Sequence, residues 1–241
     1  MRLVSTHLLD EYNVRRTIID RRYEKSRGFE LRYSNFITDL EVCEWARDNF
    51  YLILGGWCAG KDTVQDELQR LGVMRIPLLK SDRSLRPGEE IGRELIPASR
   101  YEIKKKRREG DLMIEYLVNA GIPDREQVAG IDLSLVYEAK EKGVPCAGIF
   151  YPNAAQFMID WIDPLIFVIW ATPQDRKKML KSRGVSDGFI HRFGKEQNIL
   201  GGWSDDVYLP GHRTHFVRNR WGAPWEAAEE ILRLAKEASC E

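Results

Sequence analysis

The stretch that most constrains the fold of this chain is residues 50–64, where a short apolar run meets a group of glycines. The run Phe50–Leu54 is apolar throughout, which is typical of a parallel strand buried on both faces. Glycines follow it, and Gly60-Lys61 then opens an amphipathic segment that ends at Gly72. The stretch therefore predicts a strand, a glycine loop and a helix, in that order.

The glycine loop matches a phosphate-binding pattern up to its lysine: a glycine, four residues, then Gly-Lys. Glycines let backbone N–H groups turn toward phosphate oxygens, and the helix that follows adds its positive end. The lysine would neutralise the terminal phosphates of ATP. An ordinary glycine turn is the alternative. The residues predicted to bind the ATP phosphates are Gly55, Gly56, Trp57, Cys58, Ala59, Gly60, Lys61, Asp62 and Thr63.

Composition narrows the class of protein further. The 241 residues suffice for one large α/β domain, and 37 basic against 37 acidic residues give no indication of a nucleic-acid or membrane partner. No apolar run reaches membrane-spanning length, and the N-terminus has no signal-peptide core. The four cysteines show neither metal-ligand spacing nor a disulfide framework. We therefore expect a cytoplasmic protein with reduced thiols.

Strands and helices alternate along the rest of the chain. The apolar segments predict strands over 73–79, 112–116, 146–151, 165–170 and 215–219. The amphipathic segments predict helices over 40–45, 100–109, 132–142, 186–197 and 224–238, and one that begins at Pro173. Ser99 is expected to cap the second of these helices and Gly110 to end it. The alternation predicts an α/β fold in which a mainly parallel sheet is covered on both faces and carries the glycine loop at the carboxyl end of a central strand.

Five segments in this order resemble the guanylate kinase family of P-loop nucleoside monophosphate kinases. They are the loop itself, Asp82-Arg-Ser-Leu-Arg-Pro-Gly-Glu89, Glu109-Gly-Asp-Leu-Met-Ile-Glu-Tyr116, Leu180-Lys-Ser-Arg-Gly184 behind Pro173, and Val217-Arg-Asn219. The resemblance covers roughly residues 50–238 and implies a P-loop kinase domain of three α/β/α layers. It also implies an inserted acceptor-binding subdomain over about 80–131 and a helical lid over about 183–213. Residues 1–49 would form a helical N-terminal extension.

The resemblance assigns three residues to the acceptor. Arg83 and Arg86 correspond to the pair that holds the acceptor's monophosphate, and guanidinium groups suit two-pronged phosphate contacts. Glu115 falls where the family reads the edge of guanine with a carboxylate. Two solvated arginines and an edge-strand glutamate are the alternatives.

The remaining roles implied by the resemblance concern ATP. Lys61, Arg183 and Arg192 would be the catalytic residues. The two arginines match lid arginines of the family that close over the phosphates, where neutralising negative charge accelerates phosphoryl transfer. Asn219 falls near the family's contact with the adenine of ATP, although a turn-forming asparagine is an equal alternative. An ordinary charged helix face is the alternative for the two arginines.

Several positions depart from the family pattern. Apolar residues replace an acceptor-site serine at Leu79 and a tyrosine at Leu95, and the acidic strand end of the family reads Ile149-Phe-Tyr151 here. Loss of these polar partners predicts loss of guanine specificity.

Asp62 occupies the position of the usual Mg²⁺-binding hydroxyl, which comes one residue later at Thr63. These two residues are the expected metal ligands, and Asp82 and Asp132 are other candidates. Asp132 lies on the acceptor side, and we also assign it to acceptor binding.

These features predict a phosphotransferase that uses ATP and Mg²⁺ to phosphorylate a nucleotide-type acceptor, most simply a nucleoside or deoxynucleoside monophosphate. A phosphorylated sugar and a modified nucleotide within DNA are alternative acceptors. A non-catalytic nucleotide-binding or scaffold module is the alternative from another class. The basic run 100–108 is read as a solvated helix face in preference to a nucleic-acid surface. The role of 1–49 stays open between surface packing, a homodimer arm and a contribution to the acceptor site.

Overall fold

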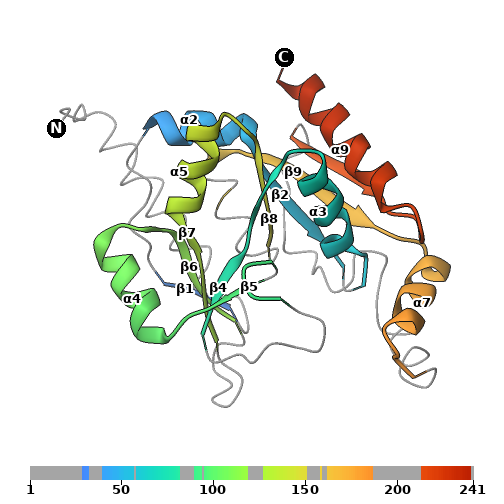
Figure 1. The fold of residues 1–241 in the computed structure, drawn as a ribbon, viewed down its shortest axis with the longest axis horizontal. Helices are drawn as coiled ribbons and strands as arrows, with labels where there is room; N and C mark the ends of the chain where they lie inside the picture. Colours follow the sequence, from blue (N-terminus) through green and yellow to red (C-terminus); the bar gives the residue numbers. More distant parts are fainter. Residues whose placement is uncertain are drawn as a thin grey trace.

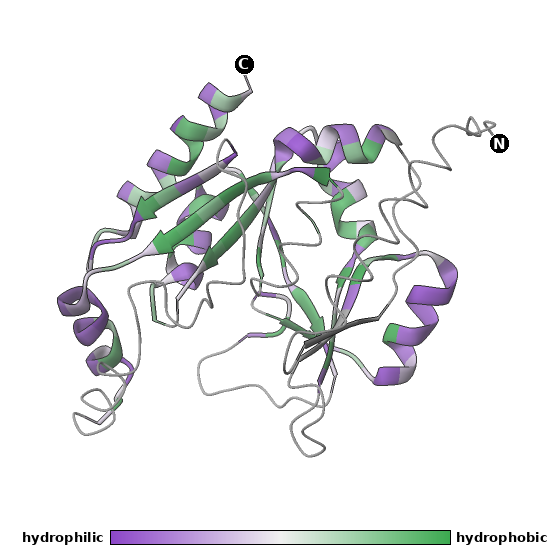
Figure 2. Ribbon diagram, turned by 180° about the vertical axis from the view of Figure 1, so that it is seen from behind, coloured by the Kyte–Doolittle hydropathy of each residue, from purple (hydrophilic) through white to green (hydrophobic). Residues whose placement is uncertain are grey.

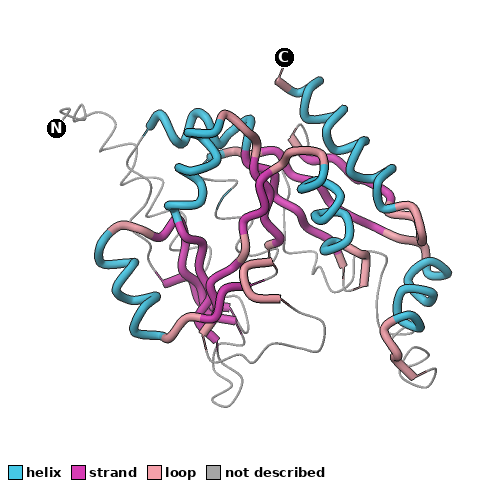
Figure 3. The backbone as a smooth tube through the Cα atoms, in the orientation of Figure 1, coloured by secondary structure: helices cyan, strands magenta, loops and turns pink. Residues whose placement is uncertain are grey.

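The structure is a computed structural model of the chain, and it describes residues 29–32, 40–56, 58–81, 90–93, 95–118, 127–150, 158, 162–186 and 213–239. Its central layer is a five-stranded sheet in which all neighbouring strands are parallel (Figures 1 and 3). In spatial order these strands are β10 (Thr214–Arg218), β9 (Leu165–Trp170), β2 (Phe50–Gly55), β8 (Cys146–Ile149) and β3 (Met74–Ile76). The strand that leads into the glycine loop, β2, is the middle one, as the sequence predicted.

Both faces of β2 are buried, because successive side chains of a strand point to opposite faces. Phe50, Leu52 and Leu54 belong to one hydrophobic cluster, and Tyr51 and Ile53 belong to another. The first cluster includes residues of helices α2 (Leu40–Asn49) and α5 (Leu133–Lys142). The second includes residues of α3 (Lys61–Arg70) and α9 (Pro224–Ala238). This double coverage explains why the strand is a continuous apolar run.

A second five-stranded sheet stands beside the parallel one (Figure 3). Its strands are, in spatial order, β1 (Phe29–Arg32), β6 (Leu112–Val118), β7 (Gln127–Asp132), β4 (Leu78–Lys80) and β5 (Leu95–Pro97). All pairs are antiparallel except β4 with β5. Met113, Ile114, Ala129 and Ile131 join the cluster that contains Phe50, so the two sheets share one core. A separate cluster joins strands of the second sheet to Ile103 of helix α4 (Arg100–Glu109).

The predicted strand over 73–79 is wrong, because this segment forms two strands in two different sheets. Pro77 separates β3, which pairs with β8 in the parallel sheet, from β4, which pairs with β7 in the second sheet. Proline has no N–H to donate and fixes φ, so it does not continue a ladder inside a sheet. The expected helical extension is also not helical throughout, because β1 lies within it and pairs with β6.

Helix ends follow the predicted local chemistry. Ser99 caps α4 in a reciprocal box with Glu102, and Gly110 ends the helix in the left-handed conformation. Pro173 is the first residue of α7 (Pro173–Ser182). Figure 2 shows hydrophobic residues concentrated on the central strands and hydrophilic ones on α4 and α7. Within the described ranges, no helix is both long and apolar enough to cross a membrane.

Candidate phosphate-binding site

The loop after β2 adopts backbone conformations that favour glycine. Gly55 has φ of 141° and Gly60 has φ of 78°. A Cβ on Gly55 would lie 2.2 Å from the carbonyl oxygen of Ile169 in the neighbouring strand, so no side chain fits at this position. Cys58 also has positive φ, at 56°, which is uncommon for a residue with a side chain. Such local strain is typical of functional loops.

Lys61 is the first residue of α3, and its ammonium group lies over the loop. Its Nζ donates to the carbonyl oxygens of Gly55 and Gly56, each at 2.9 Å. Burial lowers the pKa of Lys61, and the neighbouring Asp62 opposes that shift. A negatively charged phosphate beside the ammonium would favour its charged form. The ammonium group is therefore held against the loop backbone, and its contact with phosphate stays a prediction.

Asn219 supports the loop from the neighbouring strand end. It follows β10, is 1% exposed, and its Nδ2 donates to the carbonyl oxygen of Ala59 at 2.9 Å and to that of Gly60 at 3.5 Å. Its backbone N–H donates to Trp170 at 2.8 Å, which fixes the residue to β9. The Oδ1 atom is buried and makes no hydrogen bond with any described residue. The predicted contact of Asn219 with adenine stays a prediction, but its support of the loop was not predicted.

Arg183 approaches the loop from the end of α7. Its Nη1 lies 3.9 Å from the Sγ atom of Cys58, within hydrogen-bonding range for sulfur. Burial raises the pKa of the Cys58 thiol, and the positive charges of Arg183, Lys61 and Arg176 oppose that shift. Three basic side chains therefore act on the same part of the loop, which favours an anionic ligand. The other predicted lid arginine, Arg192, lies outside the described residues, as does Trp57.

Asp62 and Thr63, the predicted metal ligands, occupy the first turn of α3. The Asp62 side chain is 44% exposed, whereas the Thr63 hydroxyl donates to the carbonyl oxygen of Gly60 at 2.7 Å. In the described part of the chain, no group of three or more His, Cys, Asp or Glu residues is arranged to hold a metal. Mg²⁺ in nucleotide sites often uses one or two protein oxygen ligands together with substrate phosphates. An exposed carboxylate beside the loop fits that kind of site.

Two of the predicted acceptor residues, Glu115 and Asp132, lie on the second sheet and contact α4. Glu115 is 1% exposed, with its Oε1 3.5 Å from Nη1 of Arg107. Asp132 caps α5 through the backbone N–H of Ser134 and forms an ion pair with Lys106 at 2.8 Å. Their acceptor roles stay predictions. Arg83 and Arg86 lie outside the described residues, as does the alternative metal ligand Asp82.

The apolar replacements noted in the sequence have structural partners. Leu79 packs with Ile103, Leu112 and Val128, and Leu95 is 1% exposed. Phe150 is 4% exposed and lies edge-on to Phe50, with ring centroids 5.9 Å apart. The end of β8 is thus part of the core.

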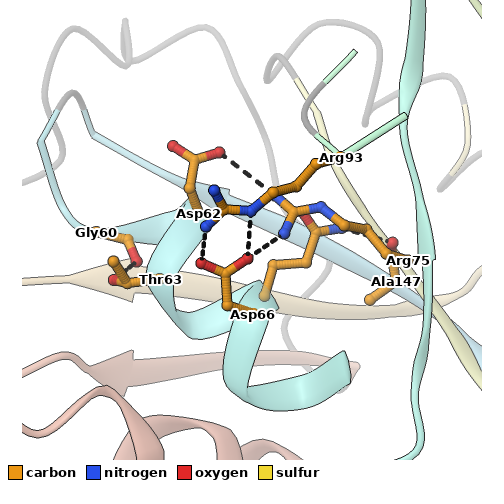
Figure 4. Close-up of polar contacts among 8 residues, drawn as sticks. Gly60, Asp62, Thr63, Asp66, Arg75, Arg93 and Ala147 are labelled. Carbon is orange, nitrogen blue, oxygen red and sulfur yellow. Dashed lines mark hydrogen bonds and ion pairs between the residues drawn. The ribbon is translucent and has the colours of Figure 1, made fainter. Parts of the chain in front are cut away.

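Sequence reasoning missed a group of charged residues beside Asp62: Asp66 on α3, Arg75 on β3, and Arg93 in the segment before β5 (Figure 4). Asp66 accepts hydrogen bonds from both arginines. Arg75 lies nine residues after Asp66 and Arg93 lies 27 residues after it, on separate elements, so no single helical or strand pattern connects the three. The one available signal was Arg75 within the apolar segment 73–79, where an arginine needs a partner.

The three cysteines that the structure describes, Cys43, Cys58 and Cys146, are free thiols. Burial raises the pKa of Cys146 and favours its neutral form.

The parallel sheet, its covering helices and the loop after the central strand define an α/β fold with a glycine loop at the carboxyl end of its central strand. No protein-family model matches the sequence, and no curated protein is significantly similar to it. Solved structures do match the fold, among them the crystal structure of guanylate kinase from Anaplasma phagocytophilum. That match has a TM-score of 0.50 and 13% sequence identity, and it covers 88% of this chain and 90% of the other. At this identity the likeness is one of fold: the chain has a guanylate kinase-like fold.

Proposed function

We propose that this protein is an ATP-dependent phosphotransferase that moves the γ-phosphate to a phosphorylated nucleotide-type acceptor. The observation that carries the proposal is the loop at the carboxyl end of β2, where Lys61, Arg183 and the start of α3 converge. Such a loop binds a triphosphate through backbone N–H groups and the positive end of a helix. The guanylate kinase-like fold supports the same chemistry in its general form.

In this proposal the protein's contribution is positioning and charge neutralisation. Lys61 would leave the loop carbonyls for the β- and γ-phosphates. Arg183, already 3.9 Å from Cys58, would neutralise charge that develops on the transferred group, and Arg192 would join it. Asp62, and Thr63 if its hydroxyl rotates away from Gly60, would hold Mg²⁺. Mg²⁺ held there would supply positive charge to offset the charge of the phosphates.

The proposed acceptor is a nucleoside or deoxynucleoside monophosphate. Arg83 and Arg86 would hold its phosphate, and Glu115 and Asp132 would position the rest of it. Glu115 must exchange Arg107 for the acceptor if it is to read a base. The apolar side chains at Leu79 and Leu95 support an acceptor other than GMP.

A non-catalytic nucleotide-binding module is the second candidate, and one observation favours it. The end of β8, where related kinases carry acids, is apolar and buried at Phe150. A scaffold would bind ATP at the loop without transferring a phosphate.

The test is transfer of labelled phosphate from ATP to a panel of nucleoside monophosphates, phosphorylated sugars and DNA. Lys61→Ala should abolish both ATP binding and transfer. Lys178→Ala is the matched control, because it removes an exposed lysine of α7, and it should change neither. ATP binding without transfer to any acceptor would support the scaffold. ATP binding that survives Lys61→Ala would refute the loop assignment.

A further inference from the structure

Four charged side chains alternate in sign beside the phosphate-binding loop (Figure 4). Arg93 donates from Nε and Nη2 to the two carboxylate oxygens of Asp66, the former bond being 3.1 Å. Asp66 also accepts from Nη1 of Arg75. The other terminal nitrogen of Arg75, Nη2, lies 3.8 Å from Oδ1 of Asp62. The order Arg93, Asp66, Arg75, Asp62 thus leads from the segment before β5 to the first turn of α3.

Arg75 is unusual because its guanidinium is buried without all of its donors being used. Its side chain is 4% exposed, and its Nε and Nη2 make no hydrogen bond with any described residue. Buried charged donors are costly to leave unsatisfied, so this edge of the guanidinium indicates a partner. The acidic group that it faces is Asp62, at a distance that a small side-chain rotation would close.

Asp62 needs such an interaction for a second reason. A carboxylate in the first turn after a phosphate-binding loop repels the phosphates unless a cation offsets its charge. Mg²⁺ bound between the carboxylate and the phosphates would turn this repulsion into attraction. A carboxylate that ligates a metal is in turn usually held by a hydrogen-bond donor that fixes its orientation.

We propose that Arg75 is a positioning residue for Mg²⁺ binding: it holds one oxygen of Asp62 so that the other faces the metal. Arg75 is itself fixed by Asp66, and Asp66 is fixed by Arg93. This inference rests on the proposed function, because it assumes that the loop binds ATP. It explains how an aspartate serves at a position where P-loops use a hydroxyl.

The test compares ATP affinity in excess Mg²⁺ with ATP affinity in EDTA, measured by isothermal titration calorimetry with a non-hydrolysable analogue. The gain in affinity on adding Mg²⁺ should fall roughly tenfold in Arg75→Lys, since loss of an outer-shell partner typically weakens metal binding by 10–100-fold. Lysine keeps the charge but cannot bridge Asp62 and Asp66 at once. Affinity in EDTA should change little. Arg70→Gln, which removes an arginine of α3 paired at the surface with Glu67, is the matched control and should behave as wild type.

A double-mutant cycle distinguishes positioning from a general structural effect. Asp62→Asn changes a side chain that is 44% exposed, so the variant should fold, and it should lose the Mg²⁺ gain. Adding Arg75→Lys to it should cause no further loss. If Arg75→Lys unfolds the protein, Asp62→Asn still tests the premise that Asp62 serves the metal: a full Mg²⁺ gain in that variant overturns the inference. Retention of the gain in folded Arg75→Lys also overturns it, whereas absence of ATP binding in the wild type refutes the proposed function itself.

Discussion

Asn219→Asp tests whether the loop depends on the amide beneath it. The substitution keeps the shape of the side chain but replaces its only N–H donor group with an acceptor. A carboxylate oxygen would then lie near the carbonyl oxygens of Ala59 and Gly60, which the amide nitrogen now contacts at 2.9 and 3.5 Å. The side chain is 1% exposed, so water cannot replace the lost donor.

Loss of the amide donor leaves the buried carbonyl oxygen of Ala59 without its hydrogen bond, which costs about 1–3 kcal/mol. We therefore expect Asn219→Asp to lower the free energy of unfolding by about 1–3 kcal/mol. If distortion of the loop reduced the binding free energy of ATP by 1.4 kcal/mol, its affinity would fall about tenfold.

Urea unfolding and calorimetric ATP binding together measure both effects. Asn49→Asp is the matched control, because the Asn49 amide also donates to a carbonyl, that of Trp45 at 3.0 Å, but at a half-buried position on α2. It should cost well under half as much. Burial without a donor should raise the pKa of the new carboxyl at position 219. The penalty should therefore shrink as the pH falls toward about 4, the ordinary pKa of an aspartate, because below that pH the carboxyl is protonated in both the folded and the unfolded state. Equal stabilities of the two variants at neutral pH would refute the reasoning.

Three further predictions concern the core and pH. Gly55→Ala should lower the free energy of unfolding, measured in urea, by about 3 kcal/mol or more and should abolish ATP binding. The reason is that Gly55 has a φ of 141° and that a Cβ at this position would clash with the Ile169 carbonyl. Normal ATP binding would contradict this. Phe167→Ala should lower the free energy of unfolding by about 3–5 kcal/mol, since this ring is fully buried between Tyr51 and His215; a loss below 1.5 kcal/mol would mean that the core refills the space. Burial, followed by the charge of Arg213, lowers the pKa of His215, so its contribution to stability is present above about pH 6.5 and is lost as the pH falls. The difference in urea midpoint between pH 7.5 and pH 5 should be smaller in His215→Gln, and an unchanged difference would exclude His215 as a source of it.

Local chemistry explains what the sequence could predict. The loop after Leu54 carries its own conformational requirements in Gly55 and Gly60, and the cap at Ser99 depends on residues three positions apart. The run 165–170 is buried on both faces and is therefore apolar throughout. In each case the interacting groups are close in the chain or share one periodic pattern.

Longer-range contacts explain what could not be predicted. Strand β5 has only three residues, and its pairing with β4 is visible only in the fold. For Asn219 the sequence offered an adenine contact or a turn, and it could not indicate the contact with Ala59, which spans 160 positions. The ion pairs of Arg75 depend on α3 and β3 meeting side by side. Arg75 and the aspartates of α3 are visible in the sequence, but nothing in it indicates that they contact each other.

Pro77, the single residue between β3 and β4, also bears on the order in which the chain folds. Met74 pairs with Cys146 on one side of it, and Leu79 pairs with Gly130 on the other. Both partners are distant in sequence, so each pairing must close a long loop before it gains any stabilisation. Once one of these pairs has formed, the one-residue connection at Pro77 limits how far the other strand can move, so that strand lies close to its own partner. Formation of the β3–β8 pair in one sheet and of the β4–β7 pair in the other should therefore be coupled during folding.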